Sequence, residues 1–550
     1  MKKILSILYF ISIAVALWAQ SSNPLRLEIP APAGSDPFNY VTAGKYGVCI
    51  FYPTVSETGK DSVSWSFMMV DDQLKESWHK QVPLSKDVTY LKSLSTKDAI
   101  YLLFHDTKRN QDGNLFVFMI IPRLQLITKH AGVIPENAEV VDFEVSDGYA
   151  LVGYNSRKSQ PAVISFSLIT GEKRNYEITA EKDALLLDVS IDTTRKEIFA
   201  TYKIQFSSSR NHLFVNRYNT SGALEKTFDF TDQNEQRNFN SAQYLPLGEG
   251  RGIVAGTYGY NVTNTRRQYD YYDYYHNNYA YNYNSSYYSR QSEYDANEDK
   301  TPVSDGYYTA VVNNGIANKI NYYYFGGFTN AFKYITEPGA LRVKTKPDKK
   351  SDKQNNEDPS NTNSSNEKTL NLRLISHEVL INQGQIFLAS EAYSPEYHTN
   401  TQMSYDYYGR SFPTSYQVFD GFRYSHAFIA GFDSSGKMLW NNGMEMRDIL
   451  TSYLNRKLNC FFENDETVLF YNANNKIAFK TIKGGNVVDN TTYIALAPKR
   501  GTDQPLDEYL GTIEYWYNDY FLATGYQTIR NNHLETAKRN VFYMSKMAFR

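Results

Sequence analysis

Cysteine is scarce in this chain: Cys49 and Cys460 are the only two among 550 residues. Two cysteines cannot form the disulfide framework of a small secreted scaffold, nor a cysteine-rich zinc site. Net charge is also nearly absent, because 57 Lys and Arg stand against 59 Asp and Glu, a formal net charge of −2. A nucleic-acid-binding protein carries a basic excess or a basic stripe. The composition therefore argues against nucleic acid as a partner.

Long apolar runs are missing everywhere except at the N-terminus. Lys2 and Lys3 precede an apolar stretch over residues 4–18, and Ala19 and Gln20 follow it. A charged start, a short apolar stretch and a small residue before the cut predict a secretory signal peptide over 1–19. About fifteen apolar residues fall short of the roughly twenty that span a bilayer. We therefore expect an exported bacterial protein, periplasmic, outer-membrane-associated or extracellular, with no transmembrane helix in the mature chain.

The motifs of common enzymes are missing as well. None of the nine His residues has a metal-ligand spacing, and no second His stands four residues after the Glu that follows His377. The chain has no G-x-S-x-G elbow, no phosphate-binding glycine loop and no dinucleotide fingerprint. The sequence therefore predicts no metal site, no cofactor and no identifiable catalytic residue.

Aromatic residues, in contrast, are abundant, with 47 Tyr and 31 Phe, a composition that favours strands. One pattern repeats about every fifty residues: four short strands, of which the second is apolar and rich in aromatics. This period is typical of a β-propeller. We count eight such units, with seven as the alternative. The second strands read YGVCIFY (46–52), AIYLLFH (99–105), YALVGY (149–154), EIFATY (197–202), GIVAGTY (252–258), QIFLASE (385–391), TVLFYN (467–472) and YFLATGY (520–526).

The two ends of the chain complement each other. The last unit supplies three strands, and the segment Leu25–Pro30 near the mature N-terminus is a candidate for the fourth. Pairing of the termini would remove open sheet edges. The sequence therefore predicts an all-β fold, a single propeller over 20–550 that is closed by its N-terminal strand. Cys49 and Cys460 fall on units that are not neighbours, so we expect both to be buried free thiols.

The turn between third and fourth strands carries a resemblance to a known family. Residues 433–440 read DSSGKMLW and 71–78 read DDQLKESW, and 169–176 and 219–228 are looser versions. This pattern resembles the D-x-x-T-G-x-x-x-W repeat of the quinoprotein-like (pyrroloquinoline-quinone type) eight-bladed propellers. The enzymes of that superfamily have a vicinal disulfide, which two distant cysteines cannot form. The resemblance therefore implies the fold and the non-enzymatic branch.

Three insertions interrupt the repeat. Residues 261–305 and 392–424 are rich in Tyr, and ten of the twenty residues over 269–288 are Tyr. Residues 344–368 are charged and polar, which predicts disorder. In a four-stranded blade such connections emerge on one side, so we expect one insertion-bearing face. Two interpretations of the Tyr-rich segments stay open, an aromatic binding surface or low-complexity disorder. The candidate binding residues are Tyr271, Tyr272, Tyr274, Tyr275, Tyr407 and Tyr408.

The first strand of each unit should line a central channel. Polar side chains on these strands could bind a small ligand, or they could simply line a hydrated channel, and a register error of one residue would reverse their facing. The channel-lining candidates are Lys92, Asp142, Asp188, Gln243, His377, Asn459 and Glu514.

Two functions fit these patterns. The first is a cell-envelope binding or scaffold protein that contacts an envelope protein or a glycan through the insertion-bearing face. The alternative is a carbohydrate-active hydrolase or lyase with its site over the central channel, which requires converging carboxylates. The absence of catalytic motifs favours the first.

Overall fold

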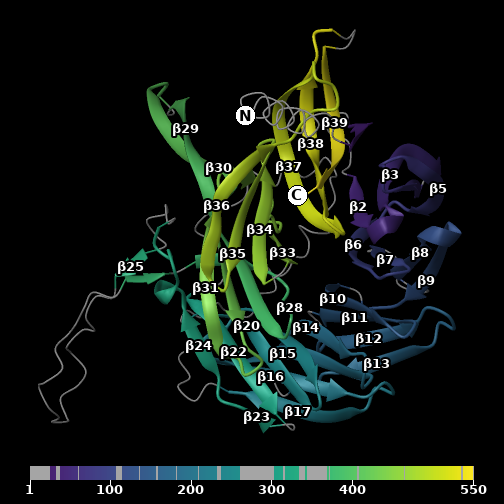
Figure 1. Ribbon diagram of the computed structural model, residues 1–550, viewed down its shortest axis with the longest axis vertical. Helices are drawn as coiled ribbons and strands as arrows, with labels where there is room; N and C mark the ends of the chain where they lie inside the picture. The colour runs from purple at the N-terminus through teal and green to yellow at the C-terminus, as the bar shows by residue number, and fades with distance from the viewer. Residues whose placement is uncertain are drawn as a thin grey trace, which may run out of the picture. The chain divides into compact units, whose positions relative to one another are not determined.

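The protein is built from antiparallel β-sheets, as the computed structural model in Figure 1 shows. Sheets of four or more strands follow one another along the chain, which confirms the predicted all-β propeller. Short 3₁₀ turns stand between some strands, among them η1 (Gly44–Tyr46), η2 (Pro122–Leu124) and η5 (Phe325–Gly327). The structure describes residues 25–31, 38–59, 61–106, 114–135, 137–156, 159–180, 183–207, 210–231, 237–259, 303–313, 316–333, 341–343, 368–370, 372–405, 408–463, 465–533 and 537–548. The predicted signal peptide and the segment 344–367 lie outside this range.

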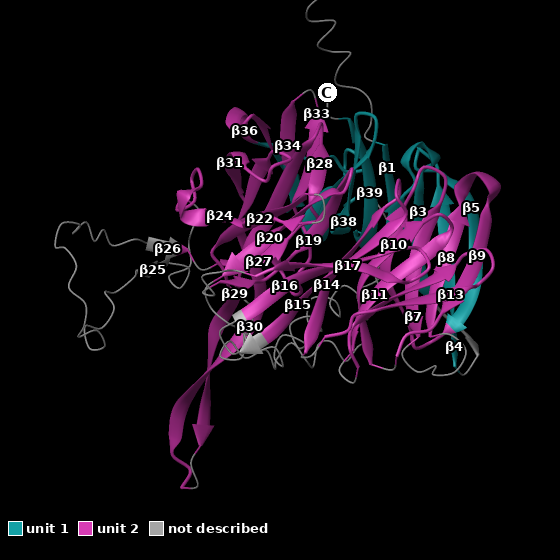
Figure 2. Cartoon of the chain, turned by 90° about the horizontal axis from the view of Figure 1, so that it is seen from below, with its two compact units in different colours: residues 1–84, 470–479, 492–550 teal, residues 85–469, 480–491 magenta. Residues whose placement is uncertain are grey.

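The chain divides into two compact units, coloured separately in Figure 2. Unit 1 comprises residues 1–84, 470–479 and 492–550, and unit 2 comprises residues 85–469 and 480–491. The boundary passes through one sheet, whose strands run in the order β33-β34-β35-β36. These strands are β33 (Asn459–Glu463), β34 (Glu466–Ala473), β35 (Lys476–Lys483) and β36 (Asn486–Ala495).

Unit 1 contains the two ends of the described chain. One sheet has the order β2-β3-β4-β5, formed by β2 (Asn39–Thr42), β3 (Val48–Gly59), β4 (Ser62–Val70) and β5 (Glu76–Ser85). The other has the order β1-β39-β38-β37, with β37 (Gln504–Tyr517), β38 (Tyr520–Arg530) and β39 (Lys538–Ala548). Strand β1 (Leu25–Pro30) pairs antiparallel with β39 along its whole length. The prediction that Leu25–Pro30 supplies the fourth strand of the last unit is therefore confirmed.

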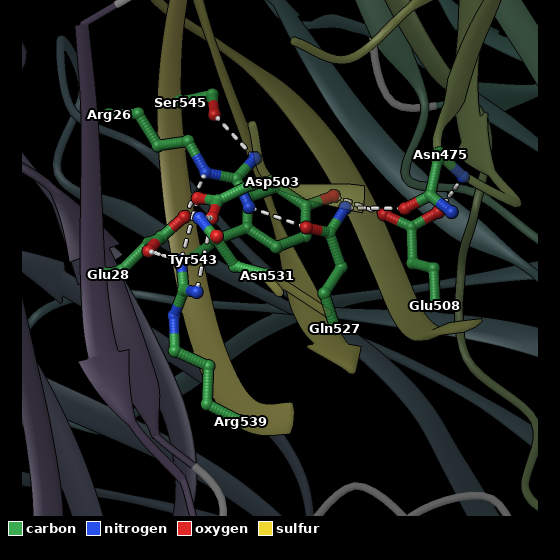
Figure 3. Close-up of polar contacts among 10 residues, drawn as sticks. All are labelled: Arg26, Glu28, Asn475, Asp503, Glu508, Gln527, Asn531, Arg539, Tyr543 and Ser545. Carbon is green, nitrogen blue, oxygen red and sulfur yellow. Dashed lines mark hydrogen bonds and ion pairs between the residues drawn. The ribbon is translucent and has the colours of Figure 1, made fainter. Parts of the chain in front are cut away.

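Polar side chains fix β1 to this sheet (Figure 3). Arg26, only 6% exposed, donates from Nε to Glu28 Oε1 at 2.9 Å and from Nη2 to Gln527 Oε1 at 2.5 Å. Arg539 in turn contacts Glu28 at 3.2 Å and Asp503 at 2.7 Å. A buried charge whose partner is removed is strongly destabilising. The network therefore makes the position of β1 depend on side chains of β38 and β39 and on Asp503, just before β37.

Unit 2 contains most of the repeat. Its sheets are formed by β6 (Val88–Ser95), β7 (Ile100–Asp106), β8 (Leu115–Ile121) and β9 (Leu126–Gly132); by β10 (Ala138–Ser146), β11 (Tyr149–Ser156), β12 (Ala162–Ser167) and β13 (Lys173–Glu177); and by β14 (Ala184–Asp192), β15 (Glu197–Ser207), β16 (Arg210–Tyr218) and β17 (Leu224–Phe230). A larger sheet contains β18 (Asn238–Phe239), β19 (Gln243–Gly248), β20 (Arg251–Gly259), β22 (Gly306–Asn313), β23 (Ile316–Ala317) and β24 (Asn321–Tyr324). The largest sheet contains β21 (Val303–Ser304), β27 (Leu372–Ser376), β28 (Leu380–Asn382), β29 (Gln385–Tyr405), β30 (Ser411–Phe432), β31 (Met438–Glu445) and β32 (Leu450–Thr451). A separate two-stranded sheet is formed by β25 (Leu341–Val343) and β26 (Lys368–Leu370).

The second strands are apolar on both faces because each sheet packs between neighbours. On β7, the consecutive residues Leu102, Leu103 and Phe104 are all 0% exposed. Successive strand residues point to opposite faces, so both faces of this strand are covered. One core cluster joins Leu103 of β7 to Val152 of β11 in the next sheet. Each fully buried side chain of this size contributes about 1.5–3 kcal/mol.

Three of the four repeated turns between third and fourth strands share one geometry. Asp433 Oδ1 accepts the backbone N–H groups of Ser435 at 2.9 Å and Lys437 at 3.0 Å. Asp71 and Asn219 accept N–H groups two and four residues ahead in the same way. The side chain thereby replaces backbone partners in the turn, as the sequence pattern indicated.

The insertion 392–424 forms a long hairpin. Strands β29 and β30 continue past the body of their sheet and remain paired from Tyr397↔Phe419 to Tyr405↔Ser411. The hairpin projects from the other strands of unit 2 in both views (Figures 1 and 2). Cross-strand contacts along it include His398–Asp420 at 2.6 Å and Asn400–Tyr416 at 3.0 Å. This segment is therefore an extension of two strands of the propeller.

Both cysteines are free, as predicted. Cys49 on β3 is buried, and burial raises the pKa of its thiol to about 12. Cys460 on β33 is half-buried as a whole residue, but burial raises the pKa of its thiol to about 12 as well.

Candidate functional site

A pocket of about 660 Å³ lies in unit 2. Its wall includes the first strands of successive sheets, β6, β10, β14 and β19, together with residues 374–379 at the end of β27 and just beyond it. The structure brings five of the predicted channel residues into this wall: Lys92, Asp142, Asp188, Gln243 and His377.

The other two channel-lining candidates, Asn459 and Glu514, are not part of the pocket wall. Asn459 begins β33 and is half-buried, and it is absent from the pocket wall. Glu514 lies on β37 in unit 1, and burial raises its pKa to about 8. The candidate site therefore consists of the first five.

Lys92, Asp142 and Asp188 occupy equivalent positions in their sheets. Immediately before each of them, the pairing of the first strand with the second shifts register. Such a bulge bends a strand and re-aims a side chain. The bulges thus give three successive sheets the same polar position on the pocket wall.

Lys92 and Asp142 form an ion pair between neighbouring sheets. Asp142 also accepts the N–H of Phe143 through Oδ1 at 2.9 Å and that of Val189, in the following sheet, through Oδ2 at 3.1 Å. Burial acts to raise the pKa of Asp142, but the Lys92 ammonium and these hydrogen bonds outweigh it and lower the pKa below its usual value. Asp142 is therefore ionised and joins three successive sheets.

Asp188 and Gln243 make the next two links. Asp188 Oδ2 accepts the N–H of Tyr244 at 3.2 Å, and Gln243 Oε1 accepts the N–H of Val379 at 2.5 Å. Burial, together with the charge of Asp142, raises the pKa of Asp188 well above its ordinary value. Asp188 therefore keeps its proton to higher pH than an exposed aspartate does.

Glu144 adds a second carboxyl with a raised pKa. It lines the pocket two residues after Asp142 on β10. Burial and the neighbouring Asp142 carboxylate raise its pKa to about 7. Near neutral pH this group can donate a proton as well as accept one.

His377 is held by a carboxylate behind the pocket wall. Its Nε2 lies 2.6 Å from Oε1 of Glu391, a side chain with 0% exposure. Glu391 also accepts the backbone N–H groups of Lys457, at 2.9 Å, and Leu458, at 3.0 Å. Because Oε1 of Glu391 already accepts these two N–H groups, we assign Nε2 of His377 as a third donor to it. In the neutral imidazole, the lone pair is then on Nδ1.

A second ion pair lies beside His377. Arg456 Nη1 contacts Glu378 Oε1 at 3.1 Å, and the two side chains are 41% and 57% exposed. Burial of its carboxyl would raise the pKa of Glu378, but the Arg456 charge outweighs this and lowers it. Exposed pairs of this kind contribute only about 0–1 kcal/mol. The pair by itself therefore adds little to the stability of the fold.

Sequence reasoning missed several of these residues. Glu144 shares a strand face with Asp142, and Glu378 follows His377 directly, so both could have been found from their spacing. Arg456 carries no such signal, because it comes 78 residues after Glu378. Glu391 lies 14 residues after His377 on the next strand of the sheet, and no spacing rule marks it as the partner of His377.

The structure describes only one of the six tyrosines that the sequence predicts as binding residues. Tyr271, Tyr272, Tyr274, Tyr275 and Tyr407 lie outside the described residues. Tyr408 stands at the tip of the β29–β30 hairpin and is 79% exposed. Tyr405 is 71% exposed, and Phe412 and Tyr416 are 47% and 44% exposed. The described part of the hairpin therefore presents aromatic side chains to solvent.

Two further properties concern the described residues only. Among them, no three His, Cys, Asp or Glu side chains are grouped so that they could hold a metal ion. The same residues contain no helix that is long and apolar enough to cross a membrane.

No model of a known protein family matches the chain, and a search of curated proteins finds no match. Membership of the quinoprotein-like superfamily therefore stays a prediction. Among solved structures, the chain is similar to the polysaccharide lyase Uly1, with 8% identity and a TM-score of 0.37 over 83% of this chain and 89% of that one. An ulvan lyase bound to a saccharide has 9% identity and a TM-score of 0.39, over 82% of this chain and 90% of that one. The β-propeller domain of the trilobed protease from Pyrococcus furiosus has 6% identity and a TM-score of 0.33, over 84% of this chain and 98% of that one. Likenesses this distant carry no argument about function.

Proposed function

We propose that this is an exported bacterial cell-envelope protein that binds a saccharide in the pocket of unit 2. The observation that carries the proposal is the wall of the pocket, which combines side-chain hydroxyls and amides with paired charges. The hydroxyl and amide groups belong to Tyr90, Ser93, Ser190, Asn240, Ser241, Gln243, Thr257, Ser304, Ser376 and Ser390.

The chemistry of this wall suits a polyhydroxylated ligand. The volume of about 660 Å³ lies in the range of small-molecule sites. Lys92 is paired with Asp142, and Arg456 with Glu378, so hydrogen bonds rather than net charge must provide most of the affinity. A sugar offers many donors and acceptors at short spacing. The links between first strands hold the polar positions in place, so little ordering is needed on binding.

The test is saccharide binding by the mature protein, measured by glycan array and calorimetry. Ser93→Trp would fill the pocket from a half-buried position on β6, and we expect it to abolish binding. Ser95→Trp is the matched control, because Ser95 is exposed on the same strand and is absent from the pocket wall. Equal affinity of the wild type and the Ser93 variant would contradict the proposal, as would a failure of all saccharides to bind.

The exposed hairpin supports a second function, contact with another envelope protein. Four aromatic side chains on it are more than a third exposed, and exposed aromatics are enriched at interfaces. A photo-crosslinker at position 408, tested in the exporting cell, should link a discrete partner. The same crosslinker at Ile169, which is 85% exposed elsewhere in unit 2, serves as the control. Identical products from both positions would rule out a specific contact at the hairpin.

A further inference from the structure

We propose that the pocket is catalytic and that His377 is its general base, acting on an acidic saccharide to break a glycosidic bond by elimination. This inference rests on the proposed saccharide binding and names the reaction and the substrate class. It is carried by the juxtaposition of His377, Glu391 and the exposed Arg456–Glu378 pair at one side of the pocket.

The arrangement of His377 is that of a positioned base. Glu391, fully buried and fixed by two backbone N–H groups, accepts from Nε2 and sets the tautomer. Nδ1 makes no hydrogen bond to any of the described residues, although His377 lines the pocket. A carboxylate that orients an imidazole in this way supports proton abstraction by its other nitrogen. Glu391 is thus a positioning residue, and His377 is the group that touches the substrate.

Four carboxyls of the pocket do not offer the pair that a glycoside hydrolase needs. Such an enzyme requires one ionised carboxylate that is free to act as base or nucleophile. Asp142 is engaged by Lys92 and by two backbone N–H groups. Asp188 and Glu144 have raised pKa values, and Glu378 is held by Arg456. The base with an open lone pair is therefore the imidazole of His377.

An imidazole can remove a proton from carbon only where the resulting charge is stabilised. In a uronic acid, the proton on C5 is adjacent to the C6 carboxylate, and a cation on that carboxylate makes the proton more acidic. Arg456 can supply the cation, because its side chain is 41% exposed at the pocket wall and its planar guanidinium binds carboxylates through two hydrogen bonds. The substrate class is therefore a polysaccharide that contains uronic acid.

The step balances without a co-reactant. Nδ1 of His377 takes the C5 proton, and the electrons of the C–H bond form the C4=C5 double bond. The C4–O bond breaks, and the leaving oxygen receives a proton from an acid in the pocket. Glu144, with a pKa of about 7, is the described carboxyl suited to that role. The products are an unsaturated uronate and a new sugar end, and no water is consumed.

The experiment incubates the mature protein with alginate, polygalacturonate and chondroitin, with dextran as the neutral control. Elimination is followed by the ultraviolet absorbance of the unsaturated product, and binding is measured separately by calorimetry. We expect His377→Ala to lower kcat by roughly 10²- to 10⁴-fold while the affinity for the polysaccharide changes little. Added imidazole should restore part of the rate of His377→Ala, which a structural role would not allow.

Glu391→Gln tests the positioning role, because an amide oxygen can still accept the backbone N–H groups. We expect a fall in kcat with KM nearly unchanged and an unaltered unfolding temperature, and partial recovery in Glu391→Asp. His398→Ala, on the exposed hairpin, is a control that also disrupts a His–carboxylate pair and should leave the rate unchanged.

The outcomes separate the two proposals. Binding of a uronate polymer without cleavage overturns this inference alone, and so does cleavage that yields reducing ends without the unsaturated product. An unchanged rate in His377→Ala also overturns it. No binding of any saccharide overturns the proposed function as well.

Discussion

Removal of the Arg26 charge should release the N-terminal strand from unit 1. The side chain of Arg26 has no exposure, and it contacts Glu28 and Gln527 as described above. Its guanidinium also lies 4.3 Å from the ring centre of Tyr543. Arg26→Met keeps most of the apolar stem and removes the charge.

The expected magnitude follows from what remains after the substitution. Breaking a buried ion pair by removal of one partner costs about 3–5 kcal/mol. Glu28 retains Arg539 at 3.2 Å, so its charge keeps one partner. We therefore expect the lower end of that range, a loss of about 3 kcal/mol in the free energy of unfolding of unit 1.

Urea denaturation followed by tryptophan fluorescence measures this loss, since Trp65, Trp78 and Trp516 all lie in unit 1. Hydrogen exchange should show faster exchange in β1 and β39 of the variant. Arg447→Met is the control, because the Arg447 side chain is 60% exposed in its pair with Glu445, and its loss should cost less than about 1 kcal/mol. A loss in Arg26→Met no larger than in the control, with β1 still protected, would refute the reasoning.

Three further predictions concern stability. The pKa of Glu144 is raised from 4.5 to about 7, so the folded protein favours the protonated carboxyl and loses stability as the pH rises through this range. Glu144→Gln should therefore match the wild type at pH 4 and exceed its free energy of unfolding by roughly 3 kcal/mol at pH 8, measured by urea titration. Equal stability at pH 8 would contradict this. In Gly256→Ala the new Cβ would lie 2.0 Å from the backbone oxygen of Ser241, so the thermal midpoint should fall by the equivalent of roughly 3 kcal/mol. Gly327 has open space around it, so Gly327→Ala should change the thermal midpoint little. Asp433→Ala removes the acceptor of the repeated turn and should cost about 1 kcal/mol by the same assay, compared with almost nothing for the exposed neighbour Ser434→Ala. An Asp433 variant as stable as its control would show that the turn does not depend on the side chain.

Much of the fold could be predicted from the sequence because it depends on local rules. Apolar runs such as 99–105 mark second strands, since a strand covered on both faces has no polar side. The turn at Asp433 depends on contacts two and four residues ahead, so its spacing is visible in the chain. The pairing of Leu25–Pro30 with the last strand followed from a missing fourth strand and an unused apolar segment.

The candidate site was predicted only in part. Five channel residues met in one pocket because each belongs to the first strand of its sheet or to the segment that follows it, a position that the repeat itself indicates. The bulges before Lys92, Asp142 and Asp188 interrupt the two-residue alternation, so their facing could not be read from the periodicity alone.

What the sequence determined by itself is the order of strands, the repeated turn and the strand that completes the last sheet, because these depend on neighbours along the chain. Only the tertiary structure decided which charges meet. Glu391 reaches His377 from the next strand of its sheet, and Arg456 reaches Glu378 from a loop 78 residues further on. A carboxylate is buried at 0% exposure only where the fold supplies donors for it. Those donors for Glu391 are backbone N–H groups of a distant segment, and no local pattern in the sequence specifies them.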